Sequence, residues 1–304
     1  MSGGARLPRA LSGGIRGPVG DVLGCTSVRC PARWLDYRLA AEVELSKQEV
    51  VGARLVSSRV MTSAEMRCAL AVAERHTLPV PRSEHEPDHV LASREVYDHS
   101  AEQYLEAVGS VVSPEFEAAI DVAVLTSFAQ ELASAPAGPV VDAGCGVGRV
   151  TRFLADAGLD ISGVDFSTAM IEAARSAHPH LRFDVGSLTR LPSPDHSLAG
   201  VVYWYSIIAT PPQDLDAVWE ELDRTLSSSG RTLVAFQAGQ NDLIETPNAY
   251  GSATTLELYR HRVDDVVHSL EKAGFDVLVE VRRKAALKYE TTPQAMLVAQ
   301  RRQG

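Results

Sequence analysis

The sequence predicts a doubly wound α/β fold with a mostly parallel sheet of seven strands. From about residue 91 onward, short apolar runs alternate with amphipathic stretches of about 10–15 residues, a pattern typical of strands and covering helices in a parallel sheet. The last two apolar runs are separated only by "LKYETTP", which is too short to hold a helix. These two runs therefore predict a C-terminal hairpin with an antiparallel edge strand.

The predicted elements follow one another with few gaps. Ser113 is expected to cap the second helix, with Pro114 in its first turn, and Ser167 to cap the fourth. The predicted helices cover 93–108, 113–134, 149–158, 167–178, 212–230 and 262–275. The predicted strands cover 138–144, 160–166, 181–187, 198–208, 231–239, 276–286 and 294–302, and 240–261 is expected to be irregular.

Charge and composition exclude several classes of protein. The chain has 29 Lys and Arg against 39 Asp and Glu, and the acidic excess lies in residues 91–304. An acidic domain repels a phosphate backbone, so nucleic acid is not an expected partner. No apolar run reaches the roughly 20 residues of a membrane span, so no membrane association is expected. Four cysteines without a C-x-x-C pair indicate free thiols in the cytoplasm and no metal site. The oligomeric state stays unknown.

Residues 1–90 differ from residues 91–304. The first segment begins rich in Gly, Pro and Arg, lacks a sustained period and ends in a proline-containing linker. It predicts a poorly ordered or short helical N-terminal extension. A targeting or regulatory arm, an accessory helical unit and a transit peptide are alternatives. Residues 91–304 are expected to form the functional domain.

A glycine run follows the first predicted strand. In "PVVDAGCGVGRVTRF", Asp142, Gly144, Gly146 and Gly148 occupy every second position, just before a predicted helix. Glycines let the backbone approach a ligand closely and adopt positive φ. In doubly wound sheets the ligand binds beyond the carboxyl ends of the strands. The run therefore predicts a cradle for a nucleotide or nucleoside.

A second acid narrows the choice of ligand. Asp165, in "GVDFS", lies 23 residues after Asp142, at the end of the second predicted strand, where a carboxylate can accept both ribose hydroxyls. The pattern D-x-G-x-G-x-G differs from the dinucleotide fingerprint G-x-G-x-x-G, and an acid beside a pyrophosphate is repulsive. These features disfavour a nicotinamide-dependent oxidoreductase, which is kept as an alternative.

With these motifs, residues 91–304 resemble the class I S-adenosylmethionine-dependent methyltransferases that act on small molecules. The glycine run resembles the first motif of that family, and Asp165 its second-strand acid. "LTRLPSPDHSLAGVVYWYS" and "HRVDDVVHSLEKAGF" resemble two further family stretches. The resemblance implies a Rossmann-like fold, S-adenosylmethionine as cofactor, and methyl transfer to an unidentified small-molecule acceptor.

The resemblance also implies roles for individual residues. Asp142 would support the methionyl amino end, and Asp165 would bind the ribose hydroxyls. Tyr97, on the N-terminal helix, would cover the cofactor, with ordinary core packing as the alternative. The other residues expected at the cofactor are Gly144, Cys145, Gly146, Gly148, Phe166, Met170, Ser187, Leu188 and Tyr203. Trp204, Tyr205 and Gln237 are expected near the substrate, with core packing or a solvated strand end as alternatives.

Two positions depart from the family pattern. Ser187 stands where the family usually has an aspartate, and Ala209 stands where a histidine is often found. No general base is therefore identified. A non-catalytic, methyltransferase-like module that binds the cofactor is the second alternative function.

Overall fold

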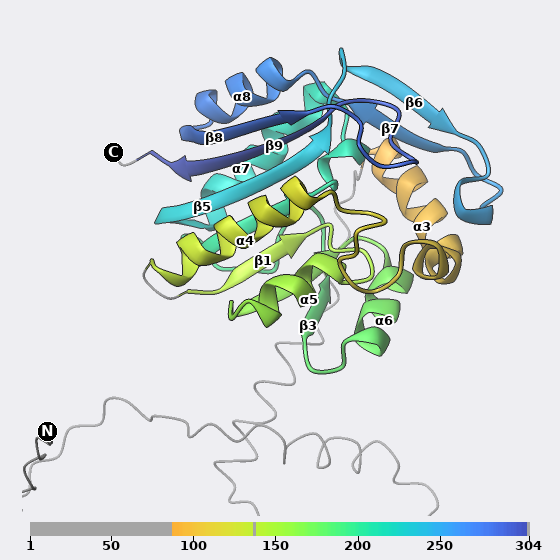
Figure 1. The fold of residues 1–304 in the computed structure, drawn as a ribbon, viewed down its shortest axis with the longest axis horizontal. Coiled ribbons are helices and arrows are strands. Elements are labelled where there is room, and N and C mark those ends of the chain that lie inside the picture. The colour runs from red at the N-terminus through yellow and green to blue at the C-terminus, as the bar shows by residue number, and fades with distance from the viewer. Residues whose placement is uncertain (1–86, 136–137, 303–304) are drawn as a thin grey trace, which may run out of the picture. The chain divides into compact units, whose positions relative to one another are not determined.

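The computed structural model describes residues 87–135 and 138–302 of the 304-residue chain (Figure 1). Predictions for residues 1–86, including the N-terminal extension, lie outside these ranges. In the described part a seven-stranded sheet carries helices on both faces, which confirms the predicted fold class. No helix in these ranges is both long and apolar enough to cross a membrane.

The sheet has the strand order β3-β2-β1-β4-β5-β9-β8. Its strands are β1 (Val140–Ala143), β2 (Ile161–Asp165), β3 (Arg182–Val185), β4 (Leu198–Trp204), β5 (Leu226–Gln237), β8 (Phe275–Arg283) and β9 (Gln294–Arg301). The strands β1 to β5 are parallel, whereas β9 is antiparallel to both of its neighbours. The chain changes direction across the sheet between β1 and β4, so the carboxyl ends of these two strands mark the usual ligand position.

Helices cover the sheet on two sides. They are α3 (Asp88–Val108), α4 (Ala119–Ala133), α5 (Arg149–Asp156), α6 (Thr168–Ala177), α7 (Leu215–Thr225) and α8 (Val263–Lys272). One core cluster joins α4 and α5 to the sheet, and another joins α7 and α8 to its other face. In β4, Val202 and Trp204 belong to the first cluster, and Val201 and Tyr203 to the second. This two-sided burial explains why the strand reads as a continuous apolar run.

Helix α4 begins six residues later than predicted, so the prediction that Ser113 is its N-cap was wrong. The backbone N–H of Ser113 donates to Glu117 Oε2 at 3.0 Å, which closes a turn before the helix. The backbone N–H of Ala118 donates to Asp121 Oδ2 at 3.0 Å, so Asp121 satisfies the helix start instead. The cap predicted at Ser167 is confirmed, since its Oγ accepts from the Met170 N–H at 3.1 Å.

Two elements in the middle of the domain end earlier than predicted. Strand β4 ends at Trp204, because Tyr205 adopts a left-handed φ of 55° and a 3₁₀ turn, η2 (Ile207–Ala209), follows. Helix α7 ends at Thr225, and the next residue, Leu226, already pairs with Leu198 of β4. The serines after α7 therefore extend β5, although the sequence placed them in the helix.

The C-terminal half contains two further differences from the prediction. The stretch 240–261 forms a two-stranded ribbon of β6 (Asp242–Thr246) and β7 (Leu256–Arg260), joined through η4 (Ala249–Gly251). The predicted hairpin is present, but its last strand is not the edge strand. β9 is inserted between β5 and β8 because its residues Gln294–Ala299 are buried on both faces, whereas every β8 residue after Phe275 is exposed or half-buried and β8 forms the edge.

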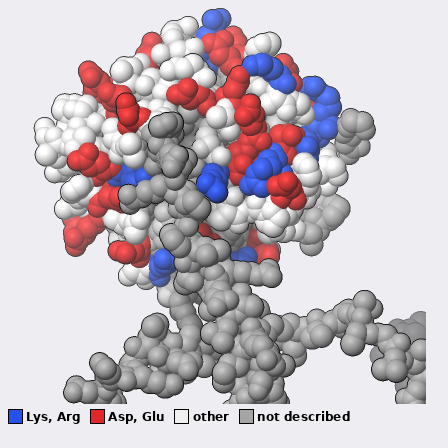
Figure 2. Space-filling model, turned by 180° about the vertical axis from the view of Figure 1, so that it is seen from behind, with Lys and Arg blue, Asp and Glu red and all other residues white. Residues whose placement is uncertain are grey.

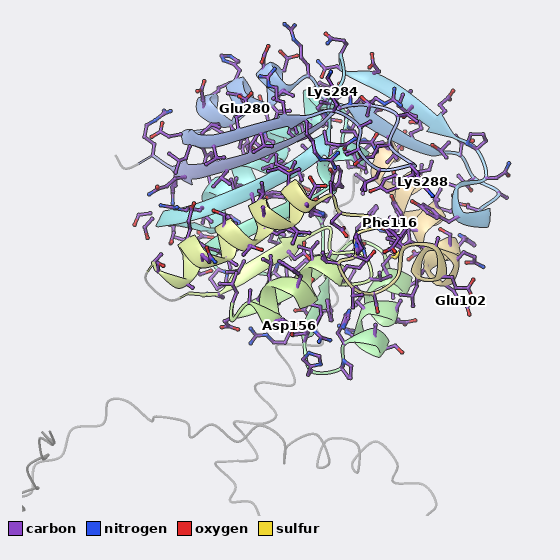
Figure 3. All side chains as sticks on the ribbon, viewed as in Figure 1. Glu102, Phe116, Asp156, Glu280, Lys284 and Lys288 are labelled. Atoms are coloured by element: carbon purple, nitrogen blue, oxygen red, sulfur yellow. The ribbon has the colours of Figure 1, made fainter. Side chains whose placement is uncertain are left out.

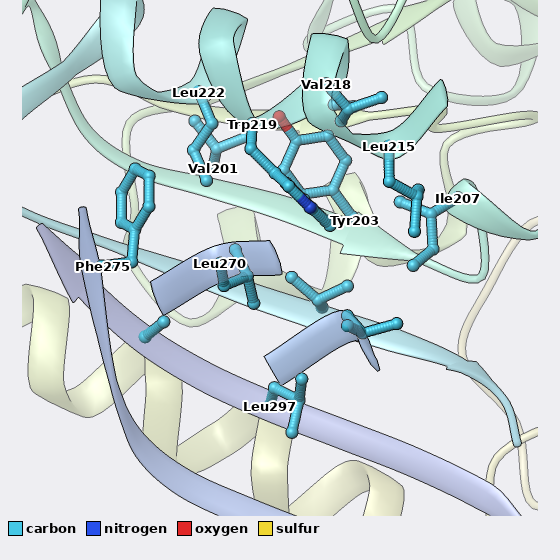
Figure 4. Close-up of a cluster of buried hydrophobic side chains, with 14 of the residues drawn as sticks. Val201, Tyr203, Ile207, Leu215, Val218, Trp219, Leu222, Leu270, Phe275 and Leu297 are labelled. Carbon is cyan, nitrogen blue, oxygen red and sulfur yellow. The ribbon is translucent and has the colours of Figure 1, made fainter. Parts of the chain in front are cut away.

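Tyr203 is a core residue. Its side chain is fully buried and meets the Trp219 ring edge-on, with centroids 5.8 Å apart, in the cluster drawn in Figure 4. Its hydroxyl is buried with no hydrogen-bond partner among the described residues. The side chain turns toward α7 because odd-numbered β4 residues face that side, and a contribution of Tyr203 to the cofactor site stays a prediction.

The Tyr203→Phe substitution should leave the fold intact and raise the free energy of unfolding by about 1–2 kcal/mol, because it removes an unpaired buried hydroxyl. Chemical denaturation of the two proteins measures the difference. Tyr203→Leu serves as the control and should destabilise the domain through a cavity. A clear loss of stability in the Phe variant would show that the hydroxyl has a partner.

Candidate functional site

The glycine-rich loop between β1 and α5 has the left-handed backbone that glycine permits. Gly144, Gly146 and Gly148 have φ of 78°, 51° and 82°. A Cβ on Gly144 would stand 2.2 Å from the Cβ of Ser206, so the loop after β4 closely approaches the glycine-rich loop here. A Cβ on Gly146 would meet a single atom within 4 Å, Tyr104 Cε1 at 3.9 Å. The main chain at Gly146 is therefore the part of the loop with room for a ligand.

Asp142 is a buried carboxylate with one unsatisfied oxygen. Its exposed fraction is 1%, and its Oδ2 accepts from the Thr151 hydroxyl at 2.7 Å. Its Oδ1 has no hydrogen-bond partner among the described residues. Burial raises the pKa of Asp142 to about 6, against the lowering effect of the Thr151 hydrogen bonds. A buried acceptor without a donor is costly, which marks a place where a ligand can supply the donor.

Asp165, the last residue of β2, holds the glycine-rich loop in place. Its Oδ2 accepts from the Gly146 N–H and its Oδ1 from the Ser167 N–H, each at 2.9 Å. Burial raises the pKa of Asp165 to about 6, although these two backbone hydrogen bonds lower it. The carboxylate expected to face a ribose thus also fixes the conformation of the loop that it borders.

The structure brings Asp142 and Asp165 to the same edge of the sheet. β1 and β2 are parallel neighbours, with Ala143 opposite Val164, so both carboxylates lie where these strands end. The charge of Asp165 raises the pKa of Asp142, and the nearby Arg149 lowers it. The two acids expected from the sequence therefore flank the glycine-rich loop.

Helix α3 is fastened to the loop that follows β2. The Ser167 hydroxyl donates to Asp98 Oδ1 at 2.6 Å, and Arg94 Nε donates to the Phe166 carbonyl at 3.0 Å. The Arg94 guanidinium lies 5.7 Å from the centroid of the Phe166 ring, and the Tyr97 ring meets that ring edge-on at 6.0 Å. Tyr97 and Phe166 are therefore in contact with one another, and Phe166 directly follows Asp165.

The other residues expected at the cofactor differ in burial and in the residues that they contact. Met170 is 1% exposed and packs in a small cluster with α3. Cys145 is half-buried, and burial followed by the charges of the two carboxylates raises the pKa of its thiol. Ser187 and Leu188 follow β3; the Ser187 hydroxyl lies 3.1 Å from Thr189 Oγ1, and Leu188 packs against the core.

The three residues expected near the substrate have different surroundings. Trp204 is 7% exposed, and its indole packs in the core on the α4 side, which matches the core alternative. Tyr205 is half-buried, and burial followed by the charge of Asp121 raises the pKa of its phenol. Gln237 is half-buried at the end of β5, and its carbonyl accepts from the His261 N–H at 3.0 Å.

The sequence analysis missed an ion pair at the start of α5. Arg149 Nη1 donates to Glu117 Oε1 at 2.7 Å, and both side chains are largely buried. Arg149 directly follows the last glycine of the run, which could have marked it as a site residue. Glu117 gave no such signal, because the sequence placed it within a continuous helix.

A buried histidine lies near the carboxyl ends of β4 and β5. His261 Nε2 is 3.1 Å from the Ile207 carbonyl oxygen, and its Nδ1 is buried without a partner among the described residues. Burial lowers the pKa of His261, so the ring stays neutral near pH 7. The ring joins η2 to the end of β7. Within the described ranges no group of three or more His, Cys, Asp and Glu could hold a metal ion.

The group around the glycine-rich loop fits S-adenosylmethionine in charge. The cofactor carries cationic sulfonium and ammonium groups together with two ribose hydroxyls, all of which favour contact with carboxylates. The unsatisfied Asp142 Oδ1 lacks a donor, and the Gly146 main chain has room beside it. Asp142, Gly146 and Asp165 would hold the cofactor.

Comparison with known proteins agrees with this geometry. Residues 140–230 match the model of a family described as methyltransferase domain. A probable S-adenosylmethionine-dependent methyltransferase of Mycolicibacterium smegmatis is 30% identical over 156 residues, which are 49% of this chain and 56% of that protein. The N-demethylindolmycin N-methyltransferase of Streptomyces griseus is 27% identical over 190 residues, covering 53% of this chain and 79% of the relative. The chain spans about half the length of the first curated relatives it matches.

A solved structure shares the fold. The magnesium protoporphyrin IX methyltransferase of Synechocystis PCC 6803, solved with bound S-adenosylmethionine, superposes with a TM-score of 0.52 at 20% identity. The match covers 72% of this chain and all of the other. At this identity the likeness shows the fold, and the roles of the site residues rest on the geometry described above.

The Asp142→Asn substitution should stabilise the ligand-free protein at pH 7.5 by about 1–3 kcal/mol, because it removes a desolvated charge and keeps an acceptor for Thr151. The same variant should bind S-adenosylmethionine more weakly. Thermal denaturation and calorimetric titration measure the two effects. A variant less stable than the parent at this pH would contradict the assignment of Asp142 as a strained, ionised group.

The stability of the ligand-free protein should fall as pH rises from about 4 to about 6. The pKa of both Asp142 and Asp165 is raised to about 6 in the folded state, so the folded protein holds protons that the unfolded chain has lost. Denaturation midpoints across this pH range test the sign, and Asp142→Asn should show a shallower fall. Equal slopes for the two proteins would count against the raised pKa of Asp142.

Proposed function

We propose, from the match of residues 140–230 to a methyltransferase-domain model, that this chain is a class I S-adenosylmethionine-dependent methyltransferase that transfers a methyl group to a small-molecule acceptor. One observation carries the proposal. The buried carboxylates of Asp142 and Asp165 flank a stretch of bare main chain, and one carboxylate oxygen lacks a donor. Such a site suits a cationic adenosyl ligand better than a dinucleotide, whose pyrophosphate the acids would repel.

The chain's own residues would bind and orient rather than react. When bound, S-adenosylmethionine supplies a methyl group on an activated sulfonium leaving group. Asp142 would accept from the methionyl ammonium, and Asp165 would accept from the ribose hydroxyls. Aligning the acceptor with the methyl group can supply about 7–11 kcal/mol of the barrier through lost translational freedom. A base is needed only where the acceptor must first lose a proton.

Further residues would enclose the cofactor. Tyr97 and Phe166, brought together by the contacts of α3, would cover the ribose side. Met170 would pack against Tyr97 and Phe166, and Ser187 and Leu188 would border the adenine. Gly144, Cys145 and Gly148 would supply main chain beneath the methionine and ribose. These roles extend from the family resemblance, and the positions of the residues support them.

A small molecule is the acceptor that the relatives favour. The Streptomyces griseus relative is named for N-methylation of N-demethylindolmycin, which is itself a small molecule. We extend this class of acceptor to the present chain. Nucleic acid is not proposed as a partner, because the domain is acidic and, on the face shown in Figure 2, basic side chains lie among acidic ones. We also propose a cytoplasmic location, because the cysteines are interpreted as free thiols and free thiols are typical of that compartment.

A binding module without turnover is the competing function. It is favoured by Ala209, which stands in η2 where the family often has a histidine, and by the structural role of the buried His261. The two functions differ in whether a labelled methyl group leaves the cofactor. An oxidoreductase is the weaker rival, because Asp142 stands where a pyrophosphate would have to lie.

Two measurements test the proposal. Isothermal titration with S-adenosylmethionine and with NADH should give binding for the first ligand alone. Incubation of the full chain with methyl-tritiated cofactor and a fractionated metabolite extract should transfer label to a small molecule. Cofactor binding without label transfer would favour the module, and binding of NADH alone would overturn the proposal.

The Asp165→Ala substitution should weaken S-adenosylmethionine binding by at least about 1.5 kcal/mol, because it removes hydrogen bonds to a charged group and frees the Gly146 N–H. Calorimetric titration measures the loss. Asp160→Ala is the matched control, since this exposed acid just before β2 forms an ion pair with Arg182 and the variant should leave binding unchanged. An unaltered dissociation constant in Asp165→Ala would contradict the proposal that Asp165 binds the ribose hydroxyls.

A further inference from the structure

Four aromatic side chains from separate segments form two ring pairs near Arg149, the residue that follows the glycine run. We call Tyr104, Phe116, Tyr250 and Tyr289 the aromatic collar. The Tyr104 and Tyr250 rings meet at 4.9 Å, and the Phe116 and Tyr289 rings at 5.5 Å. Tyr104 also stands closest to the open side of Gly146. The collar therefore begins where the expected cofactor site ends.

The arrangement of the collar is held by specific contacts. Tyr289 donates from its hydroxyl to the Phe116 carbonyl at 2.6 Å. Asn248 and Tyr250 both adopt left-handed φ, of 55° and 51°, which costs energy for residues other than glycine and is common at functional sites. Tyr250 and Tyr289 stay 37% and 54% exposed, so the collar keeps accessible ring surface.

Arg149 lies between the two halves of the collar. Its guanidinium is 5.7 Å from the centroid of the Phe116 ring, and its charge lowers the pKa of Tyr104, whereas burial and Tyr250 raise it. It also lowers the pKa of Tyr250, which burial raises. Arg149 is anchored through Nη1 on Glu117, while its side chain stays 14% exposed. A cation therefore faces the phenols from beside the glycine-rich loop.

Two further cations lie on the loop that carries Tyr289. Lys284 and Lys288 lie on the loop between β8 and β9 that also carries Tyr289, and both are exposed. Lys288 directly precedes Tyr289, whose ring contacts Phe116, and Figure 3 labels Lys288 and Phe116 in the same part of the view. Within the described ranges neither lysine ammonium forms a hydrogen bond or ion pair, and the Lys284 carbonyl accepts from Arg283 Nη1 at 3.3 Å. Their positive charge is thus available to a ligand.

Resting on the proposed methyltransferase function, we infer that the acceptor is a planar aromatic molecule with an anionic substituent, held by the aromatic collar with its anion toward Arg149. Aromatic faces stack on planar rings and gain about 0.5–1.5 kcal/mol beyond area burial. A guanidinium pairs strongly with a carboxylate or phenolate. A cationic acceptor would also suit aromatic rings, but Arg149, Lys284 and Lys288 would repel it.

The experiment uses the full chain saturated with S-adenosylhomocysteine and four probes. They are 1-hydroxy-2-naphthoate, the neutral 2-naphthol, the cationic 2-naphthylmethylamine and the aliphatic anion cyclohexanecarboxylate. Calorimetry should show that hydroxynaphthoate binds at least about tenfold more tightly than each of the others, a preference of about 1.4 kcal/mol. Equal binding of all probes, or no binding of hydroxynaphthoate, would overturn the inference.

Variants locate the binding. Arg149→Gln should abolish the preference for hydroxynaphthoate over 2-naphthol, and Tyr250→Ala should weaken both aromatic probes. Arg152→Gln is the matched control, because this arginine lies on the same helix and pairs with Asp156 at the surface. Should Arg149→Gln fail to fold, the Lys284→Gln and Lys288→Gln double variant replaces it and should lower the preference at least about twofold. A preference unaffected by these changes would overturn the inference.

The two proposals fail in different ways. If the chain does not bind S-adenosylhomocysteine, the proposed function fails and the acceptor inference fails with it. If the chain binds S-adenosylhomocysteine and the probes bind without the stated preference, only the acceptor inference fails. Formation of S-adenosylhomocysteine from S-adenosylmethionine on addition of hydroxynaphthoate would support both.

Discussion

Burial of two carboxylates at the carboxyl ends of adjacent strands is the constraint on which the site depends. Asp142 and Asp165 are almost fully removed from water, and no basic side chain forms an ion pair with either of them within the described ranges. Their charged forms are therefore unfavourable until a ligand supplies positive charge and hydrogen-bond donors. Burial of these carboxylates at β1 and β2 destabilises the folded state, and the two large core clusters on either face of the sheet offset this destabilisation.

The remaining parts of the site follow from this pair. Asp165 fixes the glycine-rich loop through the Gly146 N–H, and the residues after it anchor α3 through Asp98 and Arg94. A helix that begins far upstream in the sequence thereby lies beside the strand ends. On the other side of the loop, Arg149 and Glu117 connect α5 to the turn before α4, where the aromatic collar begins. The residues expected to bind the cofactor and those proposed to bind the acceptor thus both border the glycine-rich loop.

The sequence predicted what is encoded locally. The alternation of apolar runs predicted the order of most strands and helices, and the glycine run with its two acids predicted the position of the candidate site. Features that depend on contacts between distant residues could not be read in this way. Ser167 and Asp98 are 69 residues apart, and Arg149 and Glu117 are 32 apart, so no local pattern links them. The core packing of Tyr203 against Trp219 was not predicted, because a strand that is apolar on both faces does not reveal which face each residue takes.

Proton release on cofactor binding tests the central claim most directly. Titrating S-adenosylmethionine into the protein at pH 6, in two buffers with different ionisation enthalpies, reports the number of protons exchanged. With the pKa of both carboxyls at about 6, a cationic ligand should drive them to the charged state and release a total approaching about one proton. Heats that are independent of the buffer, or proton uptake, would contradict the account.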